Sequence, residues 1–490
     1  MNMTNLRIFN SPNYKPVWRA LPAQPEWQRI STDINFECNF ASLYKLSWVF
    51  DYEYSESDLF FAFAPPYSYG DIMQSLSFFE TNCPKDSYFF RETIVKSLDN
   101  RAVELVTISK KENFYEDQEK RQPVLFPGSK PRCPRGKKPV VFVSARVHPG
   151  ETPASYALEA FLRSLLSTDK RSSFLRKNFV FKIVPVLNPD GVFRGHYRVD
   201  QNGINLNRCY TNPSSVDHPS VFAVKSYFEY LYNLPESICM YMDFHAHASR
   251  RASFIFGNQI QGEAQINNEL FAKLVDMNSP FFEYGECDFS ERGMYAKDPK
   301  DHASKEGSGR VALYRSTGIP CSYTVECSYY IPKVFHSITP LVNLKSGRKQ
   351  TEAPMLAYPK SRVYNKEMFD SIGESLAYSI LDYYRINPIS RVLSSEFKTL
   401  DKVKEYIVLC LEKRKTKPTK TPSRRELSRG YKRNLERPPM FPKVPNRVPQ
   451  KLNKVTPVLS ERTPGSASKP KVSGTLLKRP KTMLNKPKYK

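Results

Sequence analysis

The chain has 490 residues, 40% of them apolar and 13% aromatic, so it is long enough for two or three domains with separate cores. No run approaches the roughly 20 consecutive apolar residues of a membrane helix, and the N-terminus lacks a basic flank leading into an apolar stretch. We therefore expect neither a membrane span nor a secretory signal. Nine cysteines, an odd number without CxxC spacing, favour reduced thiols in a cytosolic protein.

The first region, residues 1–125, has short apolar and aromatic runs separated by turn residues. Alternation in "SYFFRETIV" and "AVELVTIS" predicts antiparallel strands, and we expect a small antiparallel β-sandwich domain here. Residues 110–139 then break the pattern with charged residues, proline and glycine. This break predicts a domain boundary or a long loop.

The second region, residues 126–390, alternates buried apolar runs with helical patterns. The runs "PVVFVSARV", "NFVFKIVPVLN", "ICMYMDFHAHA" and "CSYTVECSYY" read as strands of a sheet covered on both faces. Helical periodicity is expected at 155–166, 221–232, 263–275 and 366–384. Such alternation predicts an α/β domain with a largely parallel or mixed central sheet flanked by helices.

The third region, residues 391–490, holds most of the net charge of +25. From residue 411 onward there are 24 Lys and Arg against four Glu, together with 12 of the 39 prolines. Such a segment buries too little apolar surface to offset its chain entropy, so we expect a mostly disordered tail. Its charge suits RNA, an anionic membrane or an acidic microtubule surface, although a solubilising tail is also compatible.

Two histidine-containing motifs follow predicted strands and form a candidate metal site. His148 and Glu151 lie in "HPGE" directly after the first buried run, where ligands gather at the carboxyl edge of an α/β sheet. His245 and His247, in "DFHAHAS", end another run and point to the same face of a strand. Two imidazoles and a carboxylate favour a catalytic zinc, with Asp243 positioned to hold a ligand's second ring nitrogen.

Three further segments carry groups suited to hydrolysis. Glu326 lies inside an apolar strand, where a carboxylate is costly unless it has a partner or a chemical role, such as taking a proton from water. The alternative is that Glu326 lies on the solvated face of an edge strand. Arg198 could stabilise an oxyanion, and Asn207 with Arg208 could bind a free carboxylate, although loop arginines are usually just solvated.

The order HPGE, NPDG…R…NLNR, DFHAH and SYTVE resembles that of the zinc carboxypeptidases. "SARVHPGETPAS", "RGHYRVDQNGINLNR" and "KEGSGRVALYRSTG" are similar to the cytosolic carboxypeptidases, and to their type-five, branch-point subgroup above all. The aromatic segment "FFAFAPPYSYGD" is similar to their N-terminal β domain. The resemblance covers roughly residues 20–390.

The resemblance implies a role for each matching residue. It makes His148, Glu151 and His245 the ligands of one Zn²⁺ per chain. Glu326 becomes the general base and Arg198 the oxyanion stabiliser. Asn207 and Arg208 would bind the substrate's terminal carboxylate, and Arg310 is a candidate for the specificity pocket unless it pairs with Glu306 or a carbonyl. Ala246 stands where glycine is usual, and no residue is assigned as the mobile tyrosine of the digestive enzymes.

The resemblance also implies substrate, partner and location. We expect removal of glutamates, including branch-point glutamates, from polyglutamylated tubulin or other acidic-tailed proteins, in the cytoplasm. Association with microtubules or cilia and presence in the nucleus stay open. No membrane partner is expected, and a nucleic-acid partner is not the expected one but stays open. The two rival hypotheses are a zinc deacylase of the aspartoacylase type and a non-catalytic microtubule- or RNA-binding protein that acts through the tail.

Overall fold

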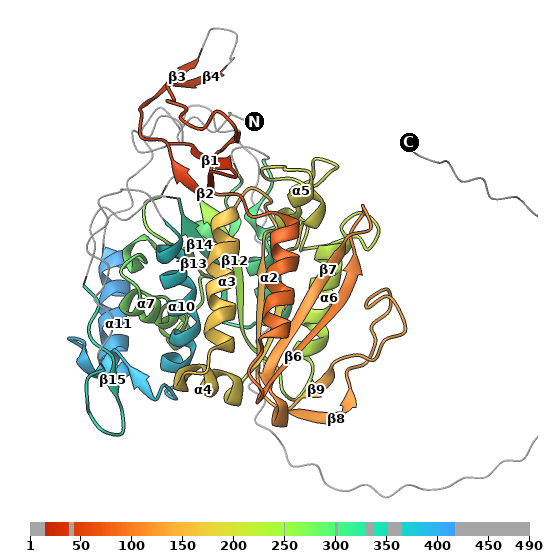
Figure 1. Ribbon diagram of the computed structural model, residues 1–490. Coiled ribbons are helices and arrows are strands. Elements are labelled where there is room, and N and C mark those ends of the chain that lie inside the picture. The colour runs from red at the N-terminus through yellow and green to blue at the C-terminus, as the bar shows by residue number, and fades with distance from the viewer. Residues whose placement is uncertain are drawn as a thin grey trace, which may run out of the picture. The chain divides into compact units, whose positions relative to one another are not determined.

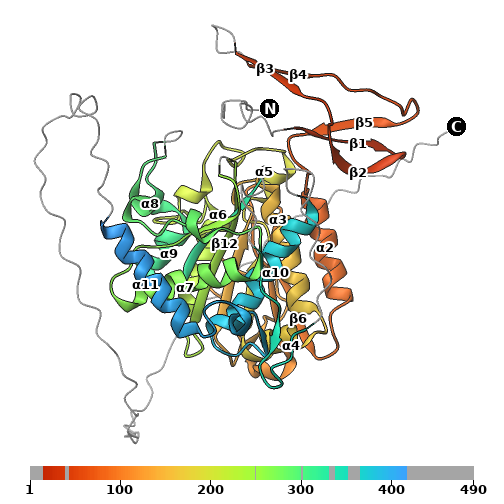
Figure 2. The same ribbon diagram turned by 90° about the vertical axis from the view of Figure 1, so that its left-hand side faces the viewer.

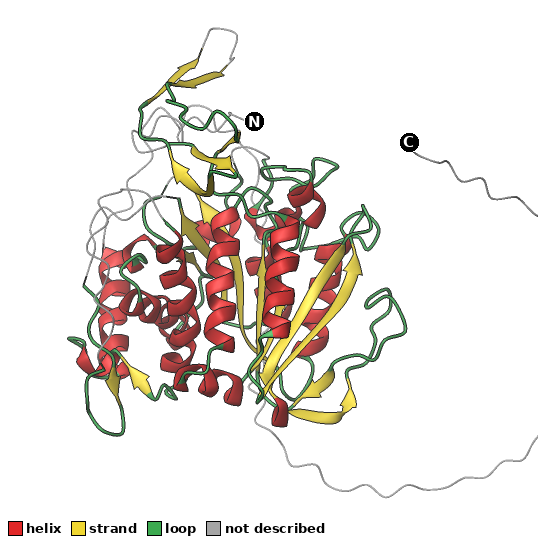
Figure 3. Cartoon of the chain, in the orientation of Figure 1, coloured by secondary structure: helices red, strands yellow, loops and turns green. Residues whose placement is uncertain are grey.

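The computed structural model describes residues 15–38, 44–248, 250–298, 302–329, 337–350 and 365–416 (Figure 1). Helices and strands alternate along the chain, and seven of the sixteen described strands form one large sheet (Figure 3). Within the described residues, no helix combines the length and the apolar character needed to span a bilayer. The predicted disordered segment after residue 416 lies outside the described residues.

The central sheet has seven strands, in the order β13-β14-β12-β10-β11-β7-β6. These are β6 (Ser87–Lys96), β7 (Ala102–Lys110), β10 (Val140–Ala145), β11 (Val180–Val184), β12 (Ile238–His247), β13 (Phe254–Phe256) and β14 (Ser322–Ser328). Neighbours among β10, β11, β12 and β14 pair in parallel, whereas β6, β7 and β13 add antiparallel edges. The predicted mixed α/β sheet is confirmed.

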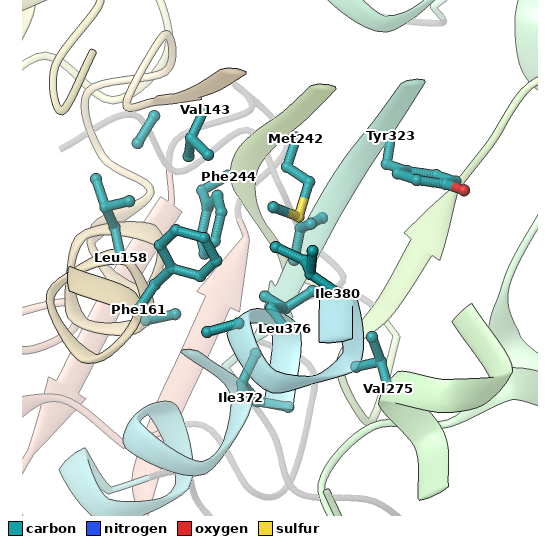
Figure 4. Close-up of a cluster of buried hydrophobic side chains, with 14 of the residues drawn as sticks. Val143, Leu158, Phe161, Met242, Phe244, Val275, Tyr323, Ile372, Leu376 and Ile380 are labelled. Carbon is teal, nitrogen blue, oxygen red and sulfur yellow. The ribbon is translucent and has the colours of Figure 1, made fainter. Parts of the chain in front are cut away.

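Helices cover both faces of this sheet because the side chains of its inner strands alternate between two apolar clusters. Val143, Met242 and Phe244 pack on one face against Leu158, Phe161, Ile372 and Leu376 (Figure 4). The helices of that face are α2 (Tyr69–Thr81), α3 (Thr152–Leu166), α4 (Lys170–Asn178), α7 (Glu263–Asn278), α10 (Lys366–Tyr383) and α11 (Leu400–Thr416). On the other face lie α6 (Pro219–Tyr232) and α9 (Gly309–Thr317).

Short elements connect the main helices and strands. They are η1 (Lys111–Asn113), β8 (Phe114–Gln118), β9 (Pro134–Gly136), α5 (Pro189–Phe193), η2 (Leu206–Arg208), η3 (Tyr284–Glu286), α8 (Glu291–Tyr295), η4 (Lys305–Gly307), β15 (Val342–Asn343), β16 (Ile389–Ser390) and η5 (Val392–Ser394). Two of them, η2 and η4, contribute to the candidate site described below.

The N-terminal strands form two small antiparallel sheets, as expected for the start of the chain (Figure 2). They are β1 (Val17–Leu21), β2 (Gln24–Arg29), β3 (Ile34–Cys38), β4 (Tyr44–Trp48) and β5 (Asp58–Ala62). Aromatic rings join the sheets: Trp48 lies 5.3 Å from Phe61, and Trp18 lies 4.9 Å from Phe50, between ring centroids. These contacts connect the strands of the small region, while Ile34, Phe36 and Leu46 of the second sheet pack against the main core cluster.

Two segments within the expected N-terminal domain differ from the prediction. Helix α2 follows β5 where only strands were expected; it begins at a capping box in which the Asp71 amide donates to Ser68 Oγ and the Ser68 amide donates to the Asp71 carboxylate. Strands β6 and β7 belong to the central sheet, because β7 pairs with β11 and is buried on both faces. The separate N-terminal sheets therefore end near residue 62.

The C-terminal part also differs, because the predicted tail from residue 391 begins with ordered structure. Helix α11 buries Val403 and Ile407 in the core. Near its end, Arg414 Nη1 lies 2.9 Å from both oxygens of the fully buried Glu269 carboxylate on α7. The folded unit therefore extends to about residue 416, and composition hid this helix because the basic, proline-rich segment that follows it dominated the reading of residues 391–490.

Candidate metal centre

The candidate site lies where three parallel strands end at one edge of the central sheet. His148 follows β10, His245 lies near the end of β12, and Glu326 lies on β14, directly opposite His245 in the register. Glu151 immediately precedes α3. This is the edge at which α/β sheets collect ligands, so the fold brings together side chains from distant parts of the chain.

The three predicted ligands converge on one point and are buried. His148 Nδ1 lies 2.9 Å from a Glu151 oxygen, and His245 Nδ1 lies 3.0 Å from the other and 3.1 Å from His148 Nδ1. Ligand atoms about 2.0–2.1 Å from a tetrahedral zinc lie about 3.3 Å apart, close to these separations. Two nitrogens and a carboxylate also match the donor set of catalytic zinc, so the residues fit the metal.

Outer contacts fix the orientation of all three side chains. The Asp243 carboxylate lies 2.7 Å from His245 Nε2, as the sequence suggested, and Asn205 Oδ1 lies 3.1 Å from His148 Nε2. The amide of Ala246 donates to Glu151 at 3.0 Å. Each imidazole is thereby held by one nitrogen and turns the other toward the common point.

The charges around the cluster favour a cation at its centre. Burial, together with the nearby Arg198 charge, lowers the pKa of His148 to about 4, so its ring is neutral at pH 7 and able to bind metal. Burial raises the pKa of Glu151, but the two histidines outweigh it and hold that pKa well below its usual value. Burial lowers the pKa of His245, but Asp243 and Glu151 outweigh it and raise that pKa.

Glu326 lies in the wall of the same site, and its pKa is raised into the neutral range. Burial raises the pKa of this carboxyl to about 7, and the Glu151 charge adds to the effect. Strand β14 lies between β12 and β13, so the alternative of a solvated edge strand does not apply. A carboxyl that titrates near neutrality can both accept and return a proton.

The two arginines predicted to bind anionic groups lie side by side and share one carboxylate. Asp298 Oδ2 accepts from Arg198 Nη2 at 3.2 Å and from Arg208 Nη2 at 2.8 Å. Asn207 places its side-chain oxygen 3.0 Å from the Gly309 amide, which fixes the turn that carries Arg208. Sequence reasoning missed Asp298, because an acidic residue in the segment "AKDPKD" carries no recognisable signal.

Arg310 is buried and anchored by the protein itself. Its guanidinium donates to the carbonyl oxygens of Gly257 and Gly293 and to Asn258 Oδ1. Of the two structural alternatives considered for Arg310, pairing with carbonyl oxygens is therefore observed. Pairing with Glu306 is not, because Glu306 pairs with Arg315. Burial lowers the pKa of Arg310 to about 10, so the side chain is positively charged at neutral pH.

All the predicted site residues line one cavity of about 500 Å³: His148, Glu151, Arg198, Asn207, Arg208, His245, Arg310 and Glu326. His247 lines it as well, with Nδ1 accepting from the Arg250 amide at 3.1 Å. Lys305 and Ser308 also line the cavity and were not singled out from the sequence, because neither belongs to a metal-binding or catalytic pattern.

A mixed α/β sheet with a His-Glu-His cluster, a buried glutamate and paired arginines at its carboxyl edge defines a zinc peptidase architecture. The zinc carboxypeptidase family profile matches residues 72–330, and the chain belongs to this family. The fold agrees with solved structures. A metallo-carboxypeptidase from Burkholderia cenocepacia matches with a TM-score of 0.55 and 17% identity, over 77% of this chain and 82% of that one. A carboxypeptidase A homologue from Shewanella denitrificans matches with a TM-score of 0.54 and 20% identity, over 79% of this chain and 84% of that one.

Within the family, the chain is similar to the cytosolic carboxypeptidases. It is 34% identical over 508 residues to the bovine cytosolic carboxypeptidase-like protein 5, covering 83% of this chain and 57% of that protein. It is 30% identical over 422 residues to the human cytosolic carboxypeptidase 6, covering 85% and 71%. The chain thus spans somewhat more than half the length of the bovine relative.

Proposed function

We propose that this zinc carboxypeptidase homologue removes glutamates from polyglutamylated or acidic-tailed proteins such as tubulin, including branch-point glutamates. The observation that carries the proposal is the single cavity in which the His148, Glu151 and His245 cluster faces Glu326 and two arginines. A metal site, a proton acceptor and anion-binding groups are what hydrolysis of a C-terminal peptide bond needs.

When bound by His148, Glu151 and His245, zinc supplies a Lewis acid that polarises the scissile carbonyl and activates water. Glu326 accepts the proton of the attacking water, because its carboxyl titrates near pH 7 beside that point. The same carboxyl returns the proton to the departing amine. Arg198, whose Nη1 lies 3.8 Å from Glu151, stabilises the negative charge that develops on the carbonyl oxygen.

Asn207 and Arg208 position the substrate by its free carboxylate. A guanidinium presents paired donors to a carboxylate, and Asp298 already occupies such a position between Arg208 and Arg198. The substrate's terminal carboxylate takes over donors that Asp298 uses. This requirement for a free carboxylate next to the metal makes the reaction that of a carboxypeptidase rather than of an endopeptidase.

Glu326→Gln tests the assignment, since it keeps the side chain's shape and removes its basicity. We expect zinc content to be unchanged and turnover of glutamylated tubulin peptides, branched and linear, to fall by about 10²–10⁴. Mass spectrometry with and without a chelator measures the product, and Glu405→Gln, exposed on α11, is the matched control. Wild-type turnover in Glu326→Gln would remove Glu326 from the mechanism, and turnover that a chelator leaves intact would remove zinc.

We further propose that the protein acts in the cytoplasm and reaches microtubules through its basic C-terminal segment. The support is the net charge of +20 carried by residues 411–490, which attracts acidic surfaces, together with the cytosolic names of its relatives. Deleting residues 417–490 would lower co-sedimentation with microtubules while leaving hydrolysis of short peptides unchanged.

A further inference from the structure

The carboxylate of Asp243, which holds His245, is itself held by a hydroxyl on the neighbouring strand. Asp243 on β12 and Ser144 on β10 are register partners, and Ser144 Oγ donates to Asp243 Oδ1 at 2.7 Å. The other carboxylate oxygen lies 2.7 Å from His245 Nε2. The terminal torsion of an aspartate has no sharp rotamer preference, so its hydrogen bonds set the plane of the carboxylate. The orientation of Asp243 therefore depends on Ser144.

A second hydroxyl, that of Tyr241, continues this chain of hydrogen bonds. Tyr241 lies two residues before Asp243 on β12, and its hydroxyl is 2.8 Å from Ser144 Oγ. A serine hydroxyl has one proton, and Ser144 gives it to Asp243, so Tyr241 is the donor in the bond to Ser144. All three side chains have an exposed fraction of 0%, so bulk solvent does not compete for these bonds.

Packing on several sides fixes the Tyr241 hydroxyl in its place. The Tyr241 ring lies 5.5 Å from the Phe228 ring and 6.2 Å from the Phe142 ring, between centroids. The first turn of α9 approaches closely, because a Cβ added to Gly309 would lie 2.9 Å from the hydroxyl oxygen. The chain of bonds from Tyr241 to Asp243 is thus anchored in a tightly packed part of the interior.

We propose that Ser144 and Tyr241 are positioning residues of the metal centre, which hold Asp243 in the plane that directs His245 Nδ1 at the zinc. Within the described residues, neither lines the cavity nor hydrogen-bonds to one of the three predicted ligands, so their effect reaches the metal through Asp243. A ligand held in its binding orientation loses less freedom when the metal binds. The inference concerns zinc affinity and does not depend on which peptide is cleaved.

The zinc affinity of the full-length protein, measured in competition with a chelator, tests these roles. Removing a group that hydrogen-bonds directly to a ligand costs about 10- to 100-fold in affinity, and Ser144 is one bond further away. We expect Ser144→Ala to weaken zinc binding about 5- to 10-fold and Tyr241→Phe to weaken it about 2- to 5-fold. Ser144→Thr keeps the hydroxyl and should bind zinc more tightly than Ser144→Ala.

Two matched variants control for the loss of a buried hydroxyl elsewhere in the same sheet. Tyr323→Phe removes a fully buried hydroxyl on β14 that donates to the Asn268 carbonyl oxygen at 3.0 Å. Ser109→Ala removes one on β7 that donates to the Phe179 carbonyl oxygen at 2.8 Å. Both should keep wild-type zinc affinity, even where the melting temperature of the zinc-free protein falls.

A double-mutant cycle separates a positioning role from a merely structural one. Asp243→Ala removes the acceptor, so adding Ser144→Ala to it should cause no further loss of zinc affinity. Losses that multiply in the double variant, or wild-type zinc affinity in Ser144→Ala, would overturn the inference. Should Ser144→Ala not fold, Tyr241→Phe decides, and zinc affinity equal to that of Tyr323→Phe would count against the proposal. A wild-type protein that binds no zinc would remove the metal centre and this inference together.

Discussion

The substitution Gly307→Ala would force apart the η2 and η4 turns at the edge of the cavity. An added Cβ would lie 2.1 Å from the carbonyl oxygen of Arg208 and 2.8 Å from its carbonyl carbon. Both neighbours are backbone atoms, so a rotamer change cannot relieve the contact. The η4 turn, which carries Lys305, therefore has to move away from the η2 turn, which carries Asn207 and Arg208.

The size of that movement sets the expected effect. Non-bonded carbon atoms rest about 3.5–4.0 Å apart, so the two turns would separate by more than about 1 Å. A displacement of this size at substrate-positioning groups costs about 100-fold in rate, and overpacking costs about 1–3 kcal/mol of stability. We expect kcat/KM on a Glu-ended peptide to fall about 100-fold and the melting temperature to fall by a few degrees, with zinc retained.

The assay compares Gly307→Ala with Gly70→Ala, whose added Cβ would lie 3.5 Å from Ser68 Oγ at an exposed position in α2. That control should keep full activity and gain slightly in stability, because alanine is the better helix former. Wild-type kcat/KM in Gly307→Ala would refute the claim that contact between η2 and η4 positions the substrate-binding residues.

Two other predictions address the metal and the C-terminal helix. Asp243→Asn replaces the carboxylate that holds His245 Nε2, so it should weaken zinc binding about 10- to 100-fold, measured in competition with a chelator. The control Asp190→Asn, at a buried ion pair outside the cluster, should bind zinc as the wild type does. Equal zinc affinities of the two variants would contradict the orienting role of Asp243. Arg414→Met leaves the fully buried Glu269 carboxylate without its guanidinium partner. We expect the free energy of unfolding, measured by denaturant titration, to fall by about 1–2 kcal/mol. An unchanged value would show that this pair does not anchor α11.

Periodicity predicted the central sheet well, because its inner strands are apolar on both faces and leave little ambiguity. The four long helices also lie close to their expected positions; the helix predicted at 263–275, for example, runs from Glu263 to Asn278. Helix α2 was missed since its segment is rich in aromatic residues, which favour strands as readily as helices. The capping box of Ser68 and Asp71 was the available signal.

Strand ends at one sheet edge must meet, so the pattern predicted that His148, His245 and Glu326 share a site, whereas the resemblance to the family supplied Arg198, Asn207, Arg208 and Arg310. Contacts made by loops were not predictable in the same way. Asp298 between the two arginines, and Lys305 over Phe256, depend on how one loop folds back onto the η2 turn. Long-range loop packing leaves no local periodicity, so neither residue could be found from the sequence alone.

The hydrogen bond from the Ala246 amide to Glu151 ties the strand bearing one predicted ligand to the helix start bearing another. Asp243 and Asn205 restrain the two imidazoles in the same way. Little conformational freedom then remains to be lost when a cation arrives, in contrast to small zinc-dependent folds that are unfolded without metal. We therefore expect zinc to bind reversibly and only after the protein has folded. Removal of the metal should leave a folded apoprotein that can bind zinc again.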